Sequence, residues 1–336
     1  MSPPGLLAGD IGGTHCRLQL FTLENGWPHS RCEYSYPSRD YPRFEPLLAD
    51  FLARCGTAPE AACLAIAGPV QDRDGQQQVD TTNLPWQLDS RALATASGIR
   101  KLRLVNDFEA IGHALDVLSD GDLAILQQGR PRPRAPRALI GAGTGLGVSL
   151  MVWDGEGYQV LATEGGHVDF APQNSLQCEL LHALQARHGP HVSVERLLSG
   201  PGLAALYAFF EQRLGQPAST EVEAARRAGD AAPAIGRLAL EGSDPLAVRS
   251  LEEFVRIYGA QAGNLALGCL PFGGLYIAGG VSRRLAPALQ DGRFLEAFLA
   301  KGRMQPLLRD IPLRLILHPD PGLLGAARLA AALASA

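Results

Sequence analysis

The sequence predicts an α/β protein with two domains, each built on a mixed sheet that carries helices on its faces. The chain has 336 residues, which at about 150 residues per domain corresponds to two domains. Apolar segments with strand-like spacing alternate with helical segments along the chain. A unit of strand, glycine turn and strand occurs twice, and its two Gly-Thr steps end at Thr14 and Thr144. A repeat with so long a period indicates duplicated domains rather than a solenoid.

The first part of the chain begins with a short apolar strand that enters a glycine-rich turn. Alternating residues after the turn predict a second strand that returns beside the first. A helix is expected next, because Leu47, Leu48, Phe51 and Leu52 recur at helical spacing. In order, the expected elements are a strand at 6–8, a strand at 17–20, a helix at 42–52, and strands at 63–67 and 102–105, the last followed by a helix to 118.

The second part repeats this opening and then becomes mostly helical. A strand at 138–140 enters the glycine turn 141–147, and a returning strand follows at 148–152. The later expected elements are helices at 175–188, 202–214, 220–228 and 245–267, strands at 275–278 and 311–317, and a last helix at 322–334.

Lysine is nearly absent, and this scarcity excludes several phosphate-binding chemistries. Of the 30 basic residues, only Lys101 and Lys301 are lysines. A P-loop needs a lysine directly after its glycines, and a protein kinase needs a strand lysine paired with a helix glutamate. Neither lysine lies in such a setting, so any bound phosphate must be held by backbone N–H groups, a metal or arginine.

The net charge argues against nucleic-acid binding, and the cysteine pattern argues against disulfide bonds. The net charge is −4, so no overall field attracts nucleic acid. The basic run 130–137 alternates arginine with proline and predicts a solvated loop ahead of a strand. The six cysteines contain no CxxC pair, and without a secretory signal we expect reduced thiols in a cytoplasmic protein.

One uncharged stretch, residues 257–282, is long enough to cross a membrane. It contains Gln261, Asn264 and Pro271, with six glycines between Ala262 and Val281, which favour a buried helix followed by a buried strand.

Two glycine turns at matching places are candidates for a divided phosphate site. In both turns, backbone N–H groups can form an anion-binding concavity, although a plain hairpin turn explains the first one equally well. A strand follows the second turn, whereas a Rossmann fingerprint requires a helix there. The first candidate set is Gly9, Asp10, Ile11, Gly12, Gly13 and Thr14, and the second lies within 141–147.

Polar residues at strand ends supply the other candidates. Asn106 and Asp107 follow a buried strand, where ligands of α/β sheets gather, but the same residue types also cap helices. Glu164 and His167 flank a Gly-Gly step and can point into one cavity. Glu195 opens a predicted helix, and a strand runs into Gly279-Gly280.

Taken together, eight motifs in order resemble the bacterial glucokinase family of the actin-like/hexokinase/Hsp70 ATPase superfamily. The resemblance covers nearly the whole chain and implies the two-domain actin-like ATPase (ribonuclease H-like) fold with a cleft between domains. It implies a small domain at 1–115 plus 320–336 and a large domain at 116–319. The motifs lie at 9–14, 104–108, 141–147, 164–170, 192–202, 263–267, 277–280 and 321–325.

The resemblance also implies an activity and its residues. Glucose would receive the γ-phosphoryl group of ATP on its 6-hydroxyl, giving glucose 6-phosphate and ADP, in a cytoplasmic homodimer with no nucleic-acid or membrane partner. Asp107 would be the general base, and Asp10 would hold Mg²⁺, directly or through water. Glucose hydroxyls would meet Asn106, Glu164, His167 and Glu195, the phosphates would meet residues 9–14 with Gly143, Thr144 and Gly145, and adenosine would meet Gly279 and Gly280.

Two departures and two alternatives accompany this interpretation. His15 stands where the family usually has asparagine, and the resemblance does not explain the basic run 130–137. The zinc-binding cysteine cluster of the related ROK sugar kinases is absent, which favours the non-ROK group. A kinase for another hexose or with another phosphoryl donor is the main alternative. A non-catalytic sugar sensor is disfavoured, because only five residues precede Leu6 and leave no room for a helix-turn-helix.

Overall fold

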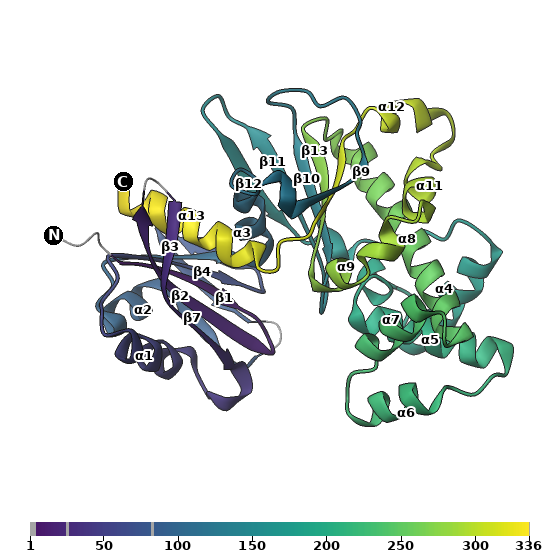
Figure 1. The fold of residues 1–336 in the computed structure, drawn as a ribbon, viewed down its shortest axis with the longest axis horizontal. Helices are drawn as coiled ribbons and strands as arrows, with labels where there is room; N and C mark the ends of the chain where they lie inside the picture. Colours follow the sequence, from purple (N-terminus) through teal and green to yellow (C-terminus); the bar gives the residue numbers. More distant parts are fainter. Residues whose placement is uncertain (1–4, 25–26, 82–83, 336) are drawn as a thin grey trace. The chain divides into compact units, whose positions relative to one another are not determined.

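The computed structural model describes residues 5–24, 27–81 and 84–335. The chain forms two compact units (Figure 1), one from 1–119 with 320–336 and one from 120–319. Sheets with parallel and antiparallel strands lie against helices in both units, which confirms the predicted fold class.

The main sheet of the first unit has the strand order β3-β2-β1-β4-β8. β1 pairs with β2 in an antiparallel hairpin, whereas β1, β4 and β8 run parallel. The parallel strands end together, because Ile11, Ile66 and Asn106 lie side by side in the register. The strands are β1 (Leu6–Ile11), β2 (His15–Glu24), β3 (Trp27–Pro37), β4 (Ala61–Ile66) and β8 (Lys101–Asn106).

Helices cover both faces of this sheet (Figure 1). On one face, α1 (Phe44–Cys55) and α2 (Ser90–Ser97) pack against the apolar side chains of β1 and β2. On the other face, α3 (Asp107–Ala114) and the C-terminal α13 (Pro321–Ser335) pack against Leu6 and Ala8. A short turn η1 (Ser38–Asp40) and a small sheet of β5 (Val70–Arg73), β6 (Gln76–Asp80) and β7 (Gln87–Asp89) complete the unit.

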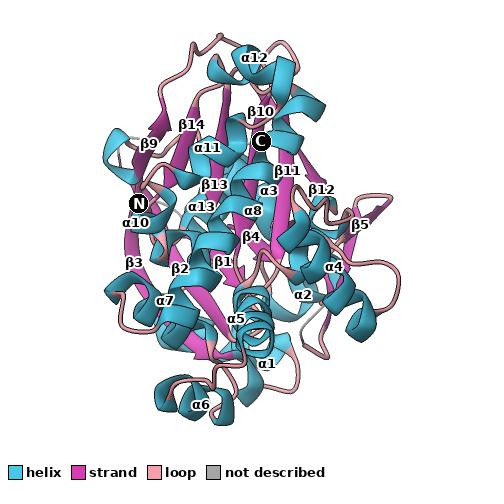
Figure 2. Ribbon diagram, turned by 90° about the vertical axis from the view of Figure 1, so that its right-hand side faces the viewer, coloured by secondary structure: helices cyan, strands magenta, loops and turns pink. Residues whose placement is uncertain are grey.

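The sheet of the second unit has the order β12-β11-β10-β13-β14-β9, which can be followed in Figure 2. β10, β13 and β14 are parallel, β11 pairs antiparallel with β10, and β12 pairs antiparallel with β11. The strands are β9 (Leu123–Gln127), β10 (Arg137–Ala142), β11 (Leu146–Trp153), β12 (Tyr158–Thr163), β13 (Gly274–Ala278) and β14 (Leu313–Ile316).

The helical part of the second unit is centred on the long helix α8, which is lined by buried apolar side chains. Over the described residues, no helix is both long and apolar enough to span a membrane. The helices are α4 (Ser175–His188), α5 (Gly200–Leu214), α6 (Thr220–Arg227), α7 (Ala232–Glu241), α8 (Pro245–Cys269), α9 (Gly280–Arg284), α10 (Ala286–Leu289), α11 (Arg293–Leu299) and α12 (Gln305–Arg309), with short turns η2 (Asp120–Asp122), η3 (Gly165–His167), η4 (Val194–Arg196) and η5 (Gly302–Met304).

Most predicted elements are present, and the uncharged stretch 257–282 is confirmed as the end of α8 followed by β13. The helix expected to reach 118 ends at Ala114 instead. Strands β3, β5–β7, β9 and β12 were not predicted. The sequences of β3 and β5–β7 are rich in polar residues, and these strands lie at a sheet edge or in the small sheet.

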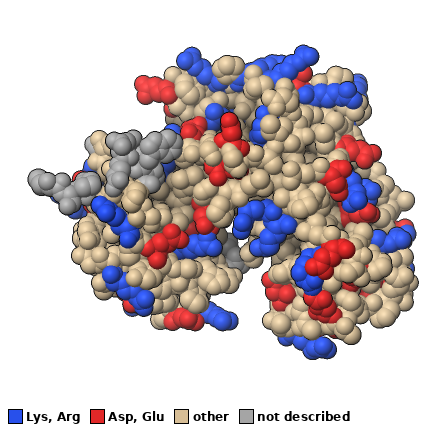
Figure 3. Space-filling model, viewed as in Figure 1, with Lys and Arg blue, Asp and Glu red and all other residues tan. Residues whose placement is uncertain are grey.

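The basic run 130–137 leads into β10 as a loop whose residues 130–134 are exposed, as predicted, and two of its arginines also stack on aromatic rings. The guanidinium of Arg132 lies 3.7 Å from the ring centre of Phe272, and that of Arg137 lies 3.8 Å from the ring centre of Tyr158. Such stacking stabilises a loop by cation–π attraction. On the face drawn in Figure 3, acidic and basic side chains are intermingled.

The expectation that all cysteines are reduced is wrong for one pair. Cys32 of β3 and Cys55 at the end of α1 form a disulfide, with their Cα atoms 6.1 Å apart. Packing of α1 on the sheet brings together two residues that are 23 positions apart in the chain. Cys16, Cys63, Cys178 and Cys269 are free thiols.

We expect the Cys32–Cys55 bond to stabilise the first unit without affecting catalysis. Closing a loop of this length restricts the unfolded chain and contributes about 3 kcal/mol. The double substitution C32S/C55S should therefore lower the unfolding midpoint, measured by thermal denaturation, and leave kcat unchanged. Cys178→Ser, which removes an exposed free thiol, is the matched control. Four free thiols in the wild-type protein show that the disulfide is formed. If the double variant then has the same unfolding midpoint as the wild type, this prediction is wrong.

Candidate active site

The first glycine turn is shorter than the sequence suggested. Gly9, Asp10 and Ile11 belong to β1, and only Gly12, Gly13 and Thr14 form the turn to β2. Gly9 is a packing residue, because a Cβ there would lie 2.5 Å from Leu64 and 2.9 Å from Leu18. Ile11 is also part of the core. The exposed backbone available to a ligand is therefore that of Gly13 and Thr14.

Hydrogen bonds from neighbouring residues fix the conformation of the turn 12–14. The amide of Gly12 donates to the carbonyl of His15 at 3.0 Å. The hydroxyl of Ser38 donates to the carbonyl of Gly12 at 2.8 Å, and the amide of Ser38 donates to the carbonyl of Thr14 at 2.9 Å. These bonds preorganise the turn before any ligand binds.

Asp10 faces Arg17 across the hairpin. The two residues are paired in the β1–β2 register, and Arg17 also forms an ion pair with Asp320, which directly precedes α13. Burial raises the pKa of Asp10, and the Arg17 guanidinium opposes this shift. Arg17 was not among the predicted site residues, although the symmetry of the hairpin about its turn would have placed it opposite Asp10.

The donor set around Asp10 fits Mg²⁺ that arrives with a nucleotide. In the described part of the chain, no cluster of three or more His, Cys, Asp or Glu side chains could hold a metal. Mg²⁺ does not require such a cluster, because it is typically bound by one or two carboxylates, substrate phosphates and water. Asp10 supplies one carboxylate beside the turn.

Asn106 and Asp107 lie where β8 ends and α3 begins. Asn106 is the helix cap, since its Oδ1 accepts the amides of Phe108 and Glu109 at 2.9 and 3.3 Å. Its Nδ2 donates to the carbonyl of Gly68 at 3.0 Å. Asp107, half-buried, is the first residue of the helix, and its Oδ1 accepts the amide of Phe108 at 3.0 Å. The capping explanation therefore holds for Asn106 and leaves Asp107 as the candidate base.

In the first unit, the structure places these candidates along one edge of the sheet. β1 and β8 are separated by β4, and the three strands end in register. Two strand spacings correspond to about 10 Å.

The second glycine turn joins β10 to β11 and is tied to α5. Gly143, Thr144 and Gly145 form it, with the amide of Gly143 donating to the carbonyl of Gly145 at 2.8 Å. The amide of Gly200, the first residue of α5, donates to the carbonyl of Gly143 at 2.9 Å. Thr144 at the tip is exposed.

Glu195 contacts this turn directly. Its Oε2 accepts the amide of Leu146 at 2.8 Å, and a Cβ at Gly145 would lie 2.5 Å from the same oxygen. A side chain at Gly145 would therefore require the Glu195 carboxylate to shift away from the turn. Glu195, which the resemblance assigns to sugar binding, therefore also supports the turn 143–145, which the resemblance assigns to phosphate binding.

Glu164, His167 and Glu195 are brought together by pairing of two short segments. The amide of Val194 donates to the carbonyl of Val168, and the amide of Phe170 donates to the carbonyl of Val192, both at 2.9 Å. The exposed side chains of Glu164 and His167 approach to 3.7 Å between Oε2 and Nε2. The second unit therefore carries a group of polar side chains beside a glycine turn.

Gly279 and Gly280 form the turn from β13 into α9. Gly279 has φ +94°, and a side chain there would overlap the carbonyl oxygen of Ala142 at the end of β10. Gly280 is exposed and begins the helix. The close approach of Gly279 places this turn beside the one that starts at Gly143.

Comparisons with known proteins agree on one family. The family model described as Glucokinase matches residues 7–333. A glucokinase of Nostoc sp. is 44% identical over 343 residues, covering 98% of this chain and 99% of that protein.

Solved structures extend the comparison. The glucokinase of an Antarctic psychrotroph has a TM-score of 0.81 and 32% identity, covering 98% of this chain and 99% of that one. A ROK family glucokinase of Streptomyces griseus, solved with glucose and AMPPNP, has a TM-score of 0.69 and 21% identity, covering 98% and 99% of the two chains, and shows the shared fold alone.

Proposed function

The chain belongs to the glucokinase family and is an ATP-dependent hexose kinase, and we propose that Asp107 is its general base. The reaction transfers the γ-phosphoryl group of ATP to the 6-hydroxyl of glucose, giving glucose 6-phosphate and ADP. The main support for this activity is the 44% identity to a glucokinase over 98% of the chain. The position of Asp107 at the end of a parallel strand supports its role.

In the proposed step, the glucose 6-oxygen attacks the γ-phosphorus while its proton passes to a carboxylate oxygen of Asp107. The bond between the γ-phosphorus and the bridging oxygen breaks, and ADP leaves with that oxygen. Phosphoryl transfer depends chiefly on positioning and charge stabilisation. Since Asp107 is held at a helix start that Asn106 caps, its carboxylate is oriented before substrate binds.

The phosphates would be held without lysine. Backbone N–H groups of Gly13 and Thr14 in the first unit, and of Gly143 to Gly145 in the second, are the proposed contacts. Asp10 would hold Mg²⁺, directly or through water, and the ion would neutralise phosphate charge. Gly279 and Gly280 are proposed to contact the adenosine.

The sugar hydroxyls are proposed to bind Glu164, His167 and Glu195, together with Asn106. This is supported by the backbone hydrogen bonds between the segments 168–170 and 192–194, which bring the first three residues together in the second unit. The side-chain amide of Asn106 has two N–H donors, and one of them donates to the carbonyl of Gly68. A contact from Asn106 to sugar would therefore use its other N–H.

We expect strong preference for glucose and ATP. A site built from hydrogen-bonding groups rejects sugars that leave those groups unpaired, and the discrimination reaches about 100-fold or more. ADP release with glucose, mannose and fructose gives kcat/KM for each sugar, and glucose 6-phosphate formation with ATP, ADP and polyphosphate tests the donor. Asp107→Ala, assayed in parallel, controls for contaminating kinases. A mannose kcat/KM within tenfold of glucose, or turnover with polyphosphate alone, would contradict this specificity.

Three further properties are proposed from family membership. The domains are placed at 1–115 plus 320–336 and at 116–319, close to the two compact units. The protein is proposed to act as a homodimer and to be cytoplasmic, where ATP is abundant. The Cys32–Cys55 bond is unusual for that compartment. A count of free thiols in protein taken directly from cells shows whether this pair is oxidised or reduced there.

A further inference from the structure

The hydroxyl of Tyr258 lies deep in the second unit, next to both turns of the proposed nucleotide site. Tyr258 is in the middle of α8 and is fully buried. Burial raises the pKa of its hydroxyl well above the ordinary value, so the group keeps its proton. Neither sequence motifs nor the proposed mechanism assigns this residue a role.

Three hydrogen bonds use the full capacity of this hydroxyl. It accepts the amide of Ala142 at 3.1 Å, donates to the carbonyl of Ile140 at 3.2 Å and lies 3.1 Å from the hydroxyl of Ser282. A phenol has one proton and can accept two hydrogen bonds. With Ser282 as a donor, every position around the oxygen is occupied.

The partners of Tyr258 connect the two turns. Ala142 directly precedes Gly143 of the phosphate turn, and Ser282 lies in the first turn of α9, two residues after Gly280. The parallel pairing of β10 and β13 stops at Gly141 and Ala278, where β13 leaves the sheet. Tyr258 hydrogen-bonds the last backbone groups of β10 at the point where this pairing ends.

We propose that Tyr258 is a positioning residue that holds the phosphate turn at 143–145 and the adenosine turn at 279–280 in the spacing that a nucleotide requires. This inference rests on the proposed function, because it takes these two turns as the nucleotide site. Tyr258 itself touches no substrate in this proposal. It acts through Ala142 on one turn and through Ser282 on the other.

Removing the hydroxyl tests the connection with little change in volume. Tyr258→Phe leaves the amide of Ala142 and the carbonyl of Ile140 without their buried partner, and an unsatisfied buried group is costly. The end of β10 is then free to move relative to α9. We expect the Kd for ADP, measured by calorimetry, to rise about tenfold, since small misplacements of binding groups have large effects. The Kd for glucose should stay unchanged.

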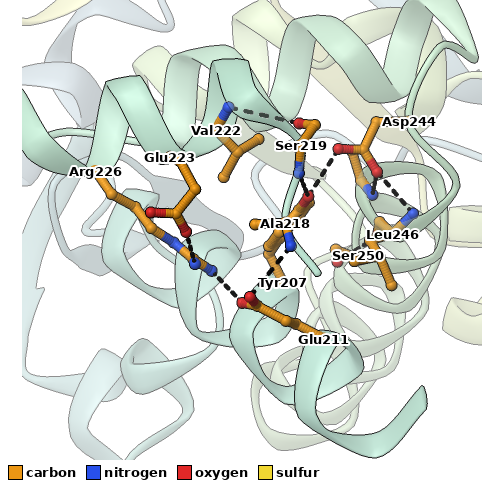
Figure 4. A network of polar contacts seen from close by, with 11 residues as sticks. Tyr207, Glu211, Ala218, Ser219, Val222, Glu223, Arg226, Asp244, Leu246 and Ser250 are labelled. Carbon is orange, nitrogen blue, oxygen red and sulfur yellow. Dashed lines mark hydrogen bonds and ion pairs between the residues drawn. The ribbon is translucent and has the colours of Figure 1, made fainter. Parts of the chain in front are cut away.

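Tyr207→Phe is a matched control, because Tyr207 is a second fully buried tyrosine of the same unit. Its hydroxyl donates to Asp244 at 2.7 Å and accepts the amide of Ser219 at 3.2 Å (Figure 4). Asp244 caps the start of α8, and Ser219 caps α6. The control removes a buried hydroxyl whose partners, Asp244 and Ser219, belong to neither turn, so it should lower the melting temperature without changing the Kd for ADP.

The outcomes separate the inference from the proposed function. If the wild type binds ADP and Tyr258→Phe binds it equally well, or loses ADP and glucose affinity alike, the inference is wrong and the function stands. If the wild type binds neither ADP nor ATP, the proposed function itself fails. Should Tyr258→Phe not fold, Ser282→Ala takes its place: a raised Kd for ADP with an unchanged Kd for glucose supports the inference, and an unchanged Kd for ADP overturns it.

Discussion

Replacing Asp107 by alanine should lower kcat by about 100- to 10,000-fold, which is the usual contribution of a general base. The Kd for glucose should change little, because the carboxylate is needed for proton transfer rather than for holding the sugar. The fold should tolerate the change, since Asn106 caps α3 and still accepts the amides of Phe108 and Glu109. Steady-state kinetics give kcat, and calorimetry gives the Kd for glucose.

Two further variants identify the cause of the loss. Asp107→Asn keeps the side-chain size and the oxygen that accepts the Phe108 amide, but it cannot take up the proton, so its kcat should be as low as that of the alanine variant. Glu109→Gln removes another acid from the first turn of the same helix, where Glu109 pairs with Arg103 at 3.0 Å. We expect its kcat to remain within about twofold of wild type, since partly exposed ion pairs contribute little. A near-normal kcat for Asp107→Asn would remove Asp107 from the role of base.

Gly279→Ala should strongly destabilise the second unit. The backbone φ of +94° is unfavourable for any residue with a Cβ, and that Cβ would overlap the carbonyl oxygen of Ala142. Backbone strain and overpacking each cost about 1–3 kcal/mol, so we expect a loss of about 2–6 kcal/mol in the free energy of unfolding. Urea denaturation followed by circular dichroism measures it.

Gly280→Ala is the control for this substitution. Gly280 lies in α9, and the nearest atom to an added Cβ is the flexible end of Arg284, 3.6 Å away. Because alanine favours helix over glycine, the free energy of unfolding should be unchanged or slightly higher. Equal stability of the Gly279→Ala and Gly280→Ala variants would show that the turn can shift away from Ala142 without cost.

The candidate site could be predicted from sequence where its signals are local. Glycine turns between two strands, and polar residues at strand ends, are recognised from a few neighbouring residues, and the turns at 12–14 and 143–145 were found in this way. The family resemblance assigned Gly9 to the phosphate loop, although its lack of a side chain serves packing against Leu18 and Leu64. A glycine in the core and a glycine at a ligand are identical in sequence.

Strands β5–β7 were missed for a related reason. The segment 70–80 is rich in glutamine and aspartate and shows little apolar alternation, so its hydrogen-bonding pattern depends on a neighbouring strand rather than on its own side chains. The disulfide was missed because spacing along the chain says nothing about whether β3 and α1 bring Cys32 and Cys55 together.

Local sequence patterns are enough to predict the alternation of strands and helices, the two glycine turns and, through the motifs, the family. These features follow from propensity and periodicity within short windows. Two contacts could be seen only in the folded chain: Glu195 supports the turn before Leu146, 49 residues away, and Tyr258 binds Ala142, 116 residues away. Such contacts are set by the packing of whole helices on whole sheets, to which every buried side chain contributes, so no local pattern encodes them.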